Sequence, residues 1–128
     1  MTDKKKLVRF IVIGLSNTLV SFIVFQAMLQ SLPETDWIGG LAQSVSYFAG
    51  VIWSFAWNRR WTFESAGIVH HEALRFAILN ITALVASTLA LHLLVDILQG
   101  SATLSWVAVM GVITVANYLV MRNWVFAR

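Results

Sequence analysis

The sequence alternates long apolar stretches with short breaks that carry nearly all of its charge. The four apolar stretches cover residues 10–29, 41–57, 76–98 and 104–120. An α-helix rises about 1.5 Å per residue, so about 20 apolar residues are enough to cross the roughly 30 Å hydrocarbon core of a bilayer. Lipid cannot satisfy backbone polar groups, whereas a helix satisfies its own. The sequence therefore predicts an all-α membrane protein with four transmembrane helices.

The composition excludes several other classes of protein. Only 12% of the 128 residues are charged and 59% are hydrophobic, whereas a soluble domain usually carries about 25% charged residues. The sequence contains no cysteine, which excludes a disulfide framework and a thiolate metal site. It also lacks a glycine-rich phosphate loop and the spacings of a serine hydrolase or a zinc protease. We therefore expect neither an enzyme nor a protein that holds a cofactor or a metal.

The positive charges fall only in alternate breaks between the apolar stretches. The nine lysines and arginines are Lys4, Lys5, Lys6, Arg9, Arg59, Arg60, Arg75, Arg122 and Arg128. The other breaks and their edges hold Glu34, Asp36 and Asp96. Because cationic residues resist translocation, this bias predicts that both termini face the cytoplasm. The net charge of +3 then reflects orientation in a membrane and not binding to nucleic acid.

The second half of the chain repeats features of the first half. At the ends of the second and fourth stretches, corresponding residues stand at one constant spacing: Phe55 and Tyr118, Arg59 and Arg122, Trp61 and Trp124, Phe63 and Phe126. Arg9-Phe10 and Arg75-Phe76 begin the first and third stretches. Each copy would be a helical hairpin with the same orientation in the membrane. We therefore predict a parallel repeat with a pseudo-two-fold axis along the membrane normal.

The second stretch also carries small or polar residues at every fourth position. These residues are Ala42, Ser46, Gly50, Ser54 and Asn58. Such a spacing places them on one face of a helix, and small residues let membrane helices approach closely. The stripe is expected to pack either inside the monomer or between two copies. Since four short helices enclose little volume, we expect a homodimer.

Taken together, these motifs resemble the GtrA-like family of small four-span bacterial membrane proteins. The matching residues cover nearly the whole chain as one domain, 1–128: Arg9-Phe10 with Gly14 and Thr18, then Asn58-Arg59-Arg60-Trp61-Thr62-Phe63, Arg75-Phe76, Asn117-Tyr118 and Arg122-Asn123-Trp124-Val125-Phe126. The resemblance implies a role in cell-surface polysaccharide or glycan synthesis. It implies translocation of a polyprenyl-phosphate-linked sugar across the bacterial cytoplasmic membrane, with a membrane glycosyltransferase as a further partner.

The arginines at the cytoplasmic ends are the candidates for binding a lipid phosphate. They are Arg9, Arg59, Arg60, Arg75 and Arg122. A guanidinium presents a planar fork that matches a phosphate bidentately, and the lipid phosphate lies at the same depth. The alternative is that these side chains only snorkel to the interface and fix the topology. The second copy has Met121 where the first has Asn58, and Asn123 where the first has Arg60, so its end is expected to bind an anion less well.

Amide side chains within the stretches are the candidates for a polar cavity that accepts the sugar. They are Asn17, Asn58, Asn80 and Asn117. An amide in hydrocarbon is costly unless it is paired, so these side chains should face a neighbouring helix or a wet cavity. Bonding between helices would explain them equally. His92 and Asp96 share a face of the third helix and are either a proton relay or a solvated pair at the far edge.

Two other functions remain open on the sequence. The chain could be a non-transporting scaffold for a polysaccharide-synthesising enzyme, or an exporter of a small solute or cation. Many small exporters carry a carboxylate in their first span, and residues 10–29 contain none. This difference favours the lipid-linked sugar.

Overall fold

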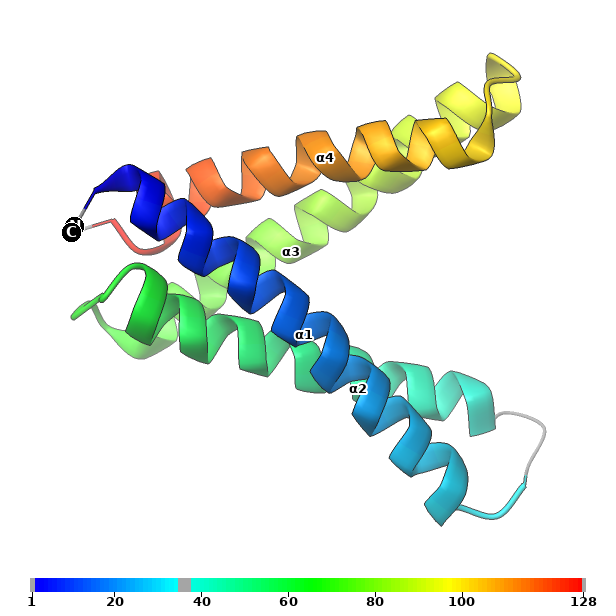
Figure 1. Ribbon diagram of the computed structural model, residues 1–128, viewed down its shortest axis with the longest axis horizontal. Coiled ribbons are helices and arrows are strands. Elements are labelled where there is room, and N and C mark those ends of the chain that lie inside the picture. Colours follow the sequence, from blue (N-terminus) through cyan, green and yellow to red (C-terminus); the bar gives the residue numbers. More distant parts are fainter. Residues whose placement is uncertain (1, 35–37, 128) are drawn as a thin grey trace. The chain divides into compact units, whose positions relative to one another are not determined.

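The computed structural model describes residues 2–34 and 38–127, and the regular structure in this part of the chain is all helical (Figure 1). The elements in order are α1 (Asp3–Ser31), α2 (Ile38–Trp57), η1 (Asn58–Thr62), α3 (Val69–Leu91), η2 (His92–Ile97), α4 (Ala102–Val120) and η3 (Met121–Val125). The chain divides into two compact units, Met1–Glu64 and Ser65–Arg128. Unit 1 contains α1, α2 and η1, and unit 2 contains the remaining elements. Asp36 and Arg128, which entered the charge argument, lie outside the described residues.

The predicted all-α fold with four long helices is confirmed. Three helical segments of the described chain are long and apolar enough to cross a membrane: Asp3–Ser31, Val69–Ile97 and Ala102–Val125. Helix α2 covers the predicted second span but is not among these three. A crossing by α2 therefore stays a prediction.

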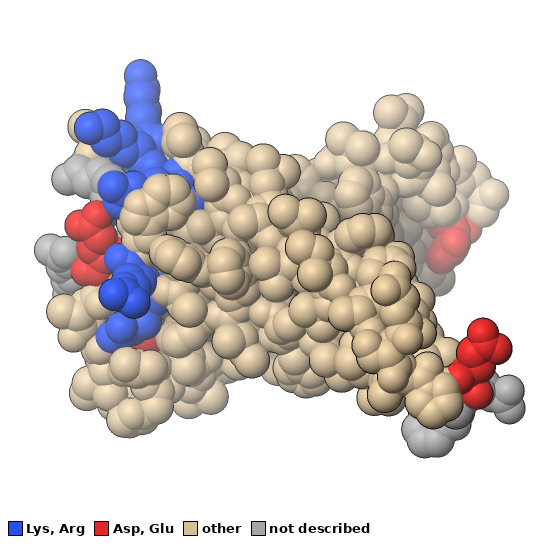
Figure 2. Space-filling model, turned by 60° about the horizontal axis from the view of Figure 1, so that its bottom comes forward, with Lys and Arg blue, Asp and Glu red and all other residues tan. Residues whose placement is uncertain are grey.

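The flanks of the helices are apolar and exposed. In the view of Figure 2, the long sides of the helices carry neither basic nor acidic atoms. Leu15 and Leu104, on α1 and α4, are 70% and 72% exposed, and many other large apolar side chains are exposed with them. In water this much apolar surface would be a liability. It is the surface expected of helices whose solvent is lipid.

In unit 1 the predicted stripe of small residues is the contact face of the hairpin. Ala42, Ser46 and Gly50 of α2 are all buried. A methyl group added at Gly50 would collide with the side chains of Asn17 and Ser21 on α1. The stripe therefore packs α2 against α1. The sequence had left open whether this stripe packs inside the monomer or between two copies, and the structure shows that it packs inside the monomer.

In unit 2 the corresponding face of α4 is also turned inward but carries larger side chains. Ser105 and Val109 of α4 are buried, as are Phe76 and Leu79 of α3. Ser101 caps the start of α4, because its hydroxyl accepts a hydrogen bond from the backbone N–H of Leu104 at 3.3 Å. Such a cap typically stabilises a helix by about 1 kcal/mol.

Candidate functional site

An arginine from the start of the first helix holds the end of the hairpin together in unit 1. Arg9 Nη1 donates to the carbonyl oxygen of Trp61 at 2.6 Å and lies 2.7 Å from Glu64 Oε1. Its guanidinium also lies 5.1 Å from the centre of the Trp61 ring, within the range of a cation–π contact. The three contacts fix residues 58–63, which we call the first exit, against the start of α1.

Unit 2 contains a similar contact at the corresponding place. Arg75 Nη1 donates to the carbonyl oxygen of Trp124 at 3.0 Å, and its guanidinium lies 5.9 Å from the Trp124 ring centre. The rings of Phe76 and Phe126 lie 6.4 Å apart beside this contact. We call residues 121–126 the second exit. In both units, one of the predicted phosphate ligands therefore bonds a backbone carbonyl of its own hairpin.

Both exits are π-helical, which widens the last turn of the preceding helix. The backbone N–H of Phe63 donates to the carbonyl of Asn58 at 2.9 Å, and that of Phe126 donates to the carbonyl of Met121, also at 2.9 Å. These are the five-residue hydrogen bonds of a π turn, a rare arrangement that is frequent at functional sites. The wide turn lets one face of each exit point inward while its arginine and tryptophan remain toward the surface.

The remaining predicted arginines lie on these wide turns. Arg59 and Arg60 are in η1, where Arg60 is exposed and Arg59 is half-buried, and Arg122 is half-buried in η3. Unit 1 thus brings Arg9, Arg59 and Arg60 to one end of its hairpin, and unit 2 brings Arg75 and Arg122 to one end of its own. An anion at either end would meet guanidinium groups.

The inward face of the first exit is polar and incompletely hydrogen-bonded. Asn58 is only 1% exposed, and its Nδ2 donates to Ser54 Oγ at 3.1 Å. Its Oδ1 atom and the Oγ1 atom of fully buried Thr62 have no hydrogen-bond partner within the described chain. A buried polar atom left in this state costs about 1–3 kcal/mol. The sequence indicated Asn58 but not Thr62, although the four-residue spacing from Asn58 could have identified it.

The other predicted amides are divided between the two units. Asn17 Oδ1 on α1 is buried without a partner in the described chain, next to Gly50. Asn80 Nδ2 donates to the carbonyl of Phe76 at 2.8 Å, one turn earlier on its own helix. Asn117 is half-buried on α4. Of the four amides, Asn17 and Asn58 of unit 1 are therefore the two that have a buried oxygen without a partner in the described chain.

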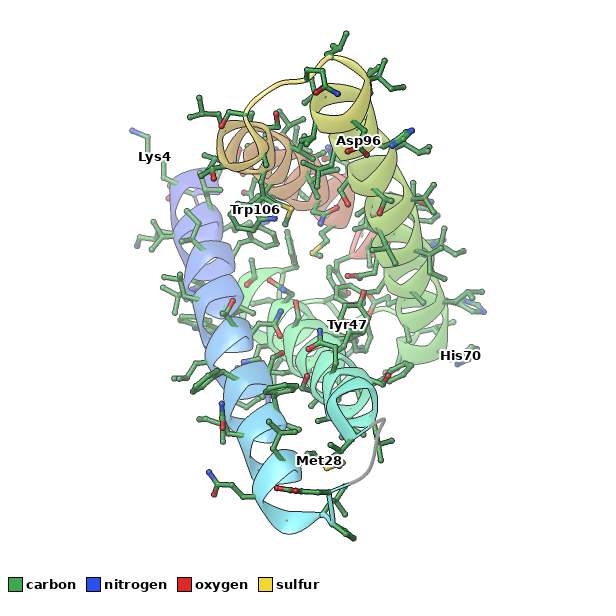
Figure 3. All side chains as sticks on the ribbon, turned by 90° about the vertical axis from the view of Figure 1, so that its right-hand side faces the viewer. Lys4, Met28, Tyr47, His70, Asp96 and Trp106 are labelled. Atoms are coloured by element: carbon green, nitrogen blue, oxygen red, sulfur yellow. The ribbon has the colours of Figure 1, made fainter. Side chains whose placement is uncertain are left out.

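His92 and Asp96 lie together in unit 2, at the opposite end of the α3–η2 helix from His70 (Figure 3). His92 Nδ1 and Asp96 Oδ2 are 2.7 Å apart, and both side chains are more than half exposed. They line a cavity of about 590 Å³ that also touches Thr88 on α3 and Trp106 on α4. The sequence predicted the pair but not its proximity to Trp106.

One buried carboxylate escaped the sequence analysis. Glu72, in the first turn of α3, is 4% exposed, and its Oε1 accepts a hydrogen bond from the hydroxyl of Ser65. The same oxygen lies where a side chain on Gly67 would be, so only glycine fits there without displacing it. Within the described chain, no group of His, Cys, Asp or Glu side chains is arranged to hold a metal ion.

Comparison with known proteins assigns the chain to a family. An uncharacterized membrane protein of Bacillus subtilis (strain 168), YngA, is 33% identical over 126 residues, which cover 95% of this chain and 80% of that protein. No solved structure matches the chain. The GtrA/DPMS transmembrane domain family matches residues 9–126, which run from the arginine at the start of α1 to the phenylalanine after η3. The protein thus belongs to the GtrA/DPMS transmembrane domain family, multi-pass membrane proteins that are linked to the handling of polyprenyl-linked sugars and are generally not catalytic.

Proposed function

We propose that the protein translocates a polyprenyl-phosphate-linked sugar across the bacterial cytoplasmic membrane for the synthesis of cell-surface polysaccharide or glycan. The observation that carries this proposal is the pair of arginine-bearing π-helical exits, one in each hairpin. Family membership supports the class of substrate. The apolar flanks of the helices suit a substrate whose long chain remains in lipid while only its head group moves.

The proposed topology has four spans and both termini in the cytoplasm. The positions of all described lysines and arginines support this orientation through the positive-inside bias. The equivalent contacts of Arg9 with Trp61 and of Arg75 with Trp124 support a parallel repeat of two hairpins. In this topology α2 also crosses the membrane and brings the number of spans to four. Its polar stripe is covered by α1 and does not face lipid.

The arginines divide into two roles in the proposed mechanism. Arg9 and Arg75 position the exits through their bonds to Trp61 and Trp124. The three arginines on the π turns, Arg59, Arg60 and Arg122, bind the lipid phosphate. A guanidinium can offer two parallel N–H groups to one phosphate, which fixes the head group as well as attracting it.

The sugar would follow the phosphate along the polar atoms inside the hairpins. Asn17, Asn58, Asn80 and Asn117 exchange hydrogen bonds with its hydroxyl groups in place of water. Rocking of one hairpin against the other then moves the head group between leaflets, as in transporters built from repeats. A gradient of the lipid-linked sugar, maintained by a glycosyltransferase on the far side, supplies the free energy. We propose a homodimer as the working unit, since four helices enclose little volume.

The test is transport in liposomes that contain a fluorescent polyprenyl-phosphate sugar. The fraction of head groups reached by a membrane-impermeant reagent should rise above that of empty vesicles when the protein is present. The double variant Arg59→Ala, Arg60→Ala should abolish the increase. Lys5→Ala, Lys6→Ala removes the same charge from the start of α1 and serves as the matched control, which should retain transport.

Two results would replace this proposal with its rivals. A wild-type protein that leaves head-group access at the level of empty vesicles, yet co-purifies with a glycosyltransferase, would be a scaffold. Transport of a small cation that is indifferent to Arg59 and Arg60 would identify an exporter.

A further inference from the structure

We propose that the cavity between η2 and α4 in unit 2 is a binding site for the sugar of the transported lipid, at the end of the hairpin far from the arginines. Its polar residues are Thr88, His92 and Asp96, and its aromatic residue is Trp106. This inference rests on the proposed function, because it takes the substrate to be a glycosylated lipid. It adds a second binding site for the head group, on the side of the membrane to which the sugar is delivered.

The size and composition of the cavity fit a sugar. The cavity is an open groove, and its volume of about 590 Å³ lies within the range of small-molecule sites, which are mostly apolar with a few polar groups that fix orientation. Aliphatic side chains of Leu89, Leu91 and Val95 form much of the wall. A pyranose presents the same mixture, with hydroxyl groups around its edge and C–H bonds on its faces.

The histidine and the aspartate can bond hydroxyl groups simultaneously. Their mutual contact, 2.7 Å between His92 Nδ1 and Asp96 Oδ2, uses one nitrogen and one oxygen. The second imidazole nitrogen can then donate to or accept from one hydroxyl of a sugar ring. The second carboxylate oxygen can accept from the neighbouring hydroxyl. The hydroxyl of Thr88, one turn earlier on the helix, supplies another donor at the same wall.

A purely structural role does not account for this pair. The two side chains are 60% and 63% exposed, and an exposed ion pair on a helix surface contributes little to stability. The pair also lies in the π-helical segment η2, which ends with a hydrogen bond of 2.9 Å from the backbone N–H of Leu98 to the carbonyl of Leu93. Rare π turns of this kind are frequent where a helix builds a binding site.

Trp106 supplies the aromatic face on the opposite helix. It lies near the start of α4, is 55% exposed and borders the same cavity as Asp96 (Figure 3). An indole ring is large, rigid and apolar on its face, which suits stacking against the C–H face of a pyranose. The exposed ring therefore lines the same cavity as the polar pair, an arrangement that an aromatic anchor at the membrane interface does not require.

The experiment measures binding of free monosaccharides to the full chain in lipid nanodiscs by saturation-transfer NMR. The probes are glucose, galactose, mannose, arabinose and N-acetylglucosamine, none of which carries a phosphate or a lipid. We expect a saturable signal for at least one of them. Trp106→Ala and Asp96→Asn should each weaken its affinity about tenfold, a loss typical of removing one stacked ring or one charged hydrogen-bond acceptor.

Phe48→Ala is the matched control, because Phe48 is a 65% exposed aromatic residue of unit 1, away from this cavity. It should leave the signal unchanged. Absence of a saturable signal for every sugar, or equal signals from the wild type and the two cavity variants, would overturn the inference. If His92 and Asp96 serve only as a proton relay, their variants would lose pH-driven transport but keep sugar binding, which would also overturn it.

The outcomes separate this inference from the proposed function. Liposome transport that persists while all monosaccharide signals are absent would remove the cavity site and retain the flippase. A specific monosaccharide signal without transport would retain the cavity site and remove the flippase.

Discussion

In unit 1 the first exit buries Asn58 and Thr62, whereas in unit 2 the second exit buries Met121 and Val125 at the corresponding positions. The backbone is π-helical in both, and both are held by an arginine that donates to a tryptophan carbonyl. The hairpins therefore share a scaffold but differ in what it encloses. A polar interior with unused hydrogen-bonding capacity can accept a hydrated head group, while an apolar interior serves as packing.

The same contrast extends to the contacts of the arginine that holds each exit. Arg9 contacts both the carbonyl and the ring of Trp61 in the first exit, and it also pairs with Glu64, the residue that follows this exit. Arg75 makes the carbonyl bond and a longer approach to its tryptophan ring. The polar interior, which costs stability, therefore occurs in the hairpin end with the stronger closure. We therefore expect the first exit to be the principal head-group site.

The largest effect is expected from removing this closure. Arg9→Ala loses a charge-assisted hydrogen bond, an ion pair and a cation–π contact, and should lower the free energy of unfolding by about 2–3 kcal/mol. The ion pair is partly exposed and contributes the least of the three. Arg75→Ala should cost about 1–2 kcal/mol on the same argument. Denaturant titration in mixed micelles compares them, and equal losses would contradict the difference in closure.

A second prediction concerns the stripe that packs α2 on α1. Gly50→Ile introduces a branched side chain where a single carbon already meets Asn17 and Ser21, and should destabilise unit 1 by about 1–3 kcal/mol. Ile113 stands at the corresponding position of α4 and is half-buried there, so Ile113→Gly tests the reverse change in unit 2. The effect of both substitutions is measured by thermal unfolding in detergent, with aggregation of the protein as the signal. A neutral Gly50→Ile would show that the hairpin does not need the close approach.

The third prediction makes the first exit resemble the second. Asn58→Met with Thr62→Val removes two buried atoms that have no partner in the described chain, and should raise the unfolding free energy by about 1 kcal/mol or leave it unchanged. Transport of the lipid-linked sugar should nevertheless fall, because the head group loses its polar contacts. Increased stability together with undiminished transport would assign these residues to packing alone.

The smallest effect is expected at Asn80 in unit 2. Its amide bonds the carbonyl of Phe76 on its own helix, so Asn80→Ala should cost at most about 1 kcal/mol. Circular dichroism during heating would measure the change. A loss of unfolding free energy as large as that of Arg9→Ala would show that Asn80 also stabilises a contact between helices, which its local bond does not indicate.

Much of the architecture could be predicted from the sequence, because apolar stretches of sufficient length have few alternatives to helices. The correspondence of Trp61 with Trp124 was also visible, since both follow the same run of residue types at a constant spacing. The small stripe from Ala42 to Asn58 predicted a close contact correctly but not its partner. Periodicity describes one helix and carries no information about which helix it meets.

The parts of the site that escaped prediction depend on contacts between distant positions. The bonds from Arg9 to Trp61 and Glu64 join residues more than 50 positions apart, and nothing in the local sequence marks them. Glu72 stands in a break between two apolar stretches, and only the fold, which brings it beside Ser65 and Gly67, shows that it is buried. Trp106 stands near the start of an apolar stretch, and only the packing of α4 beside η2 shows the cavity that it borders.

The central claim is that the arginine-bearing exits bind an anionic lipid head group, and lipid binding tests it most directly. Native mass spectrometry of the purified protein, equilibrated with equal amounts of a polyprenyl phosphate and the uncharged polyprenol, reports the preference between them. We predict retention of the phosphate form by the wild type, and loss of that preference in the Arg59→Ala, Arg60→Ala, Arg122→Ala variant. Equal retention of the two lipids by the wild type would contradict the account and leave these arginines as anchors of topology.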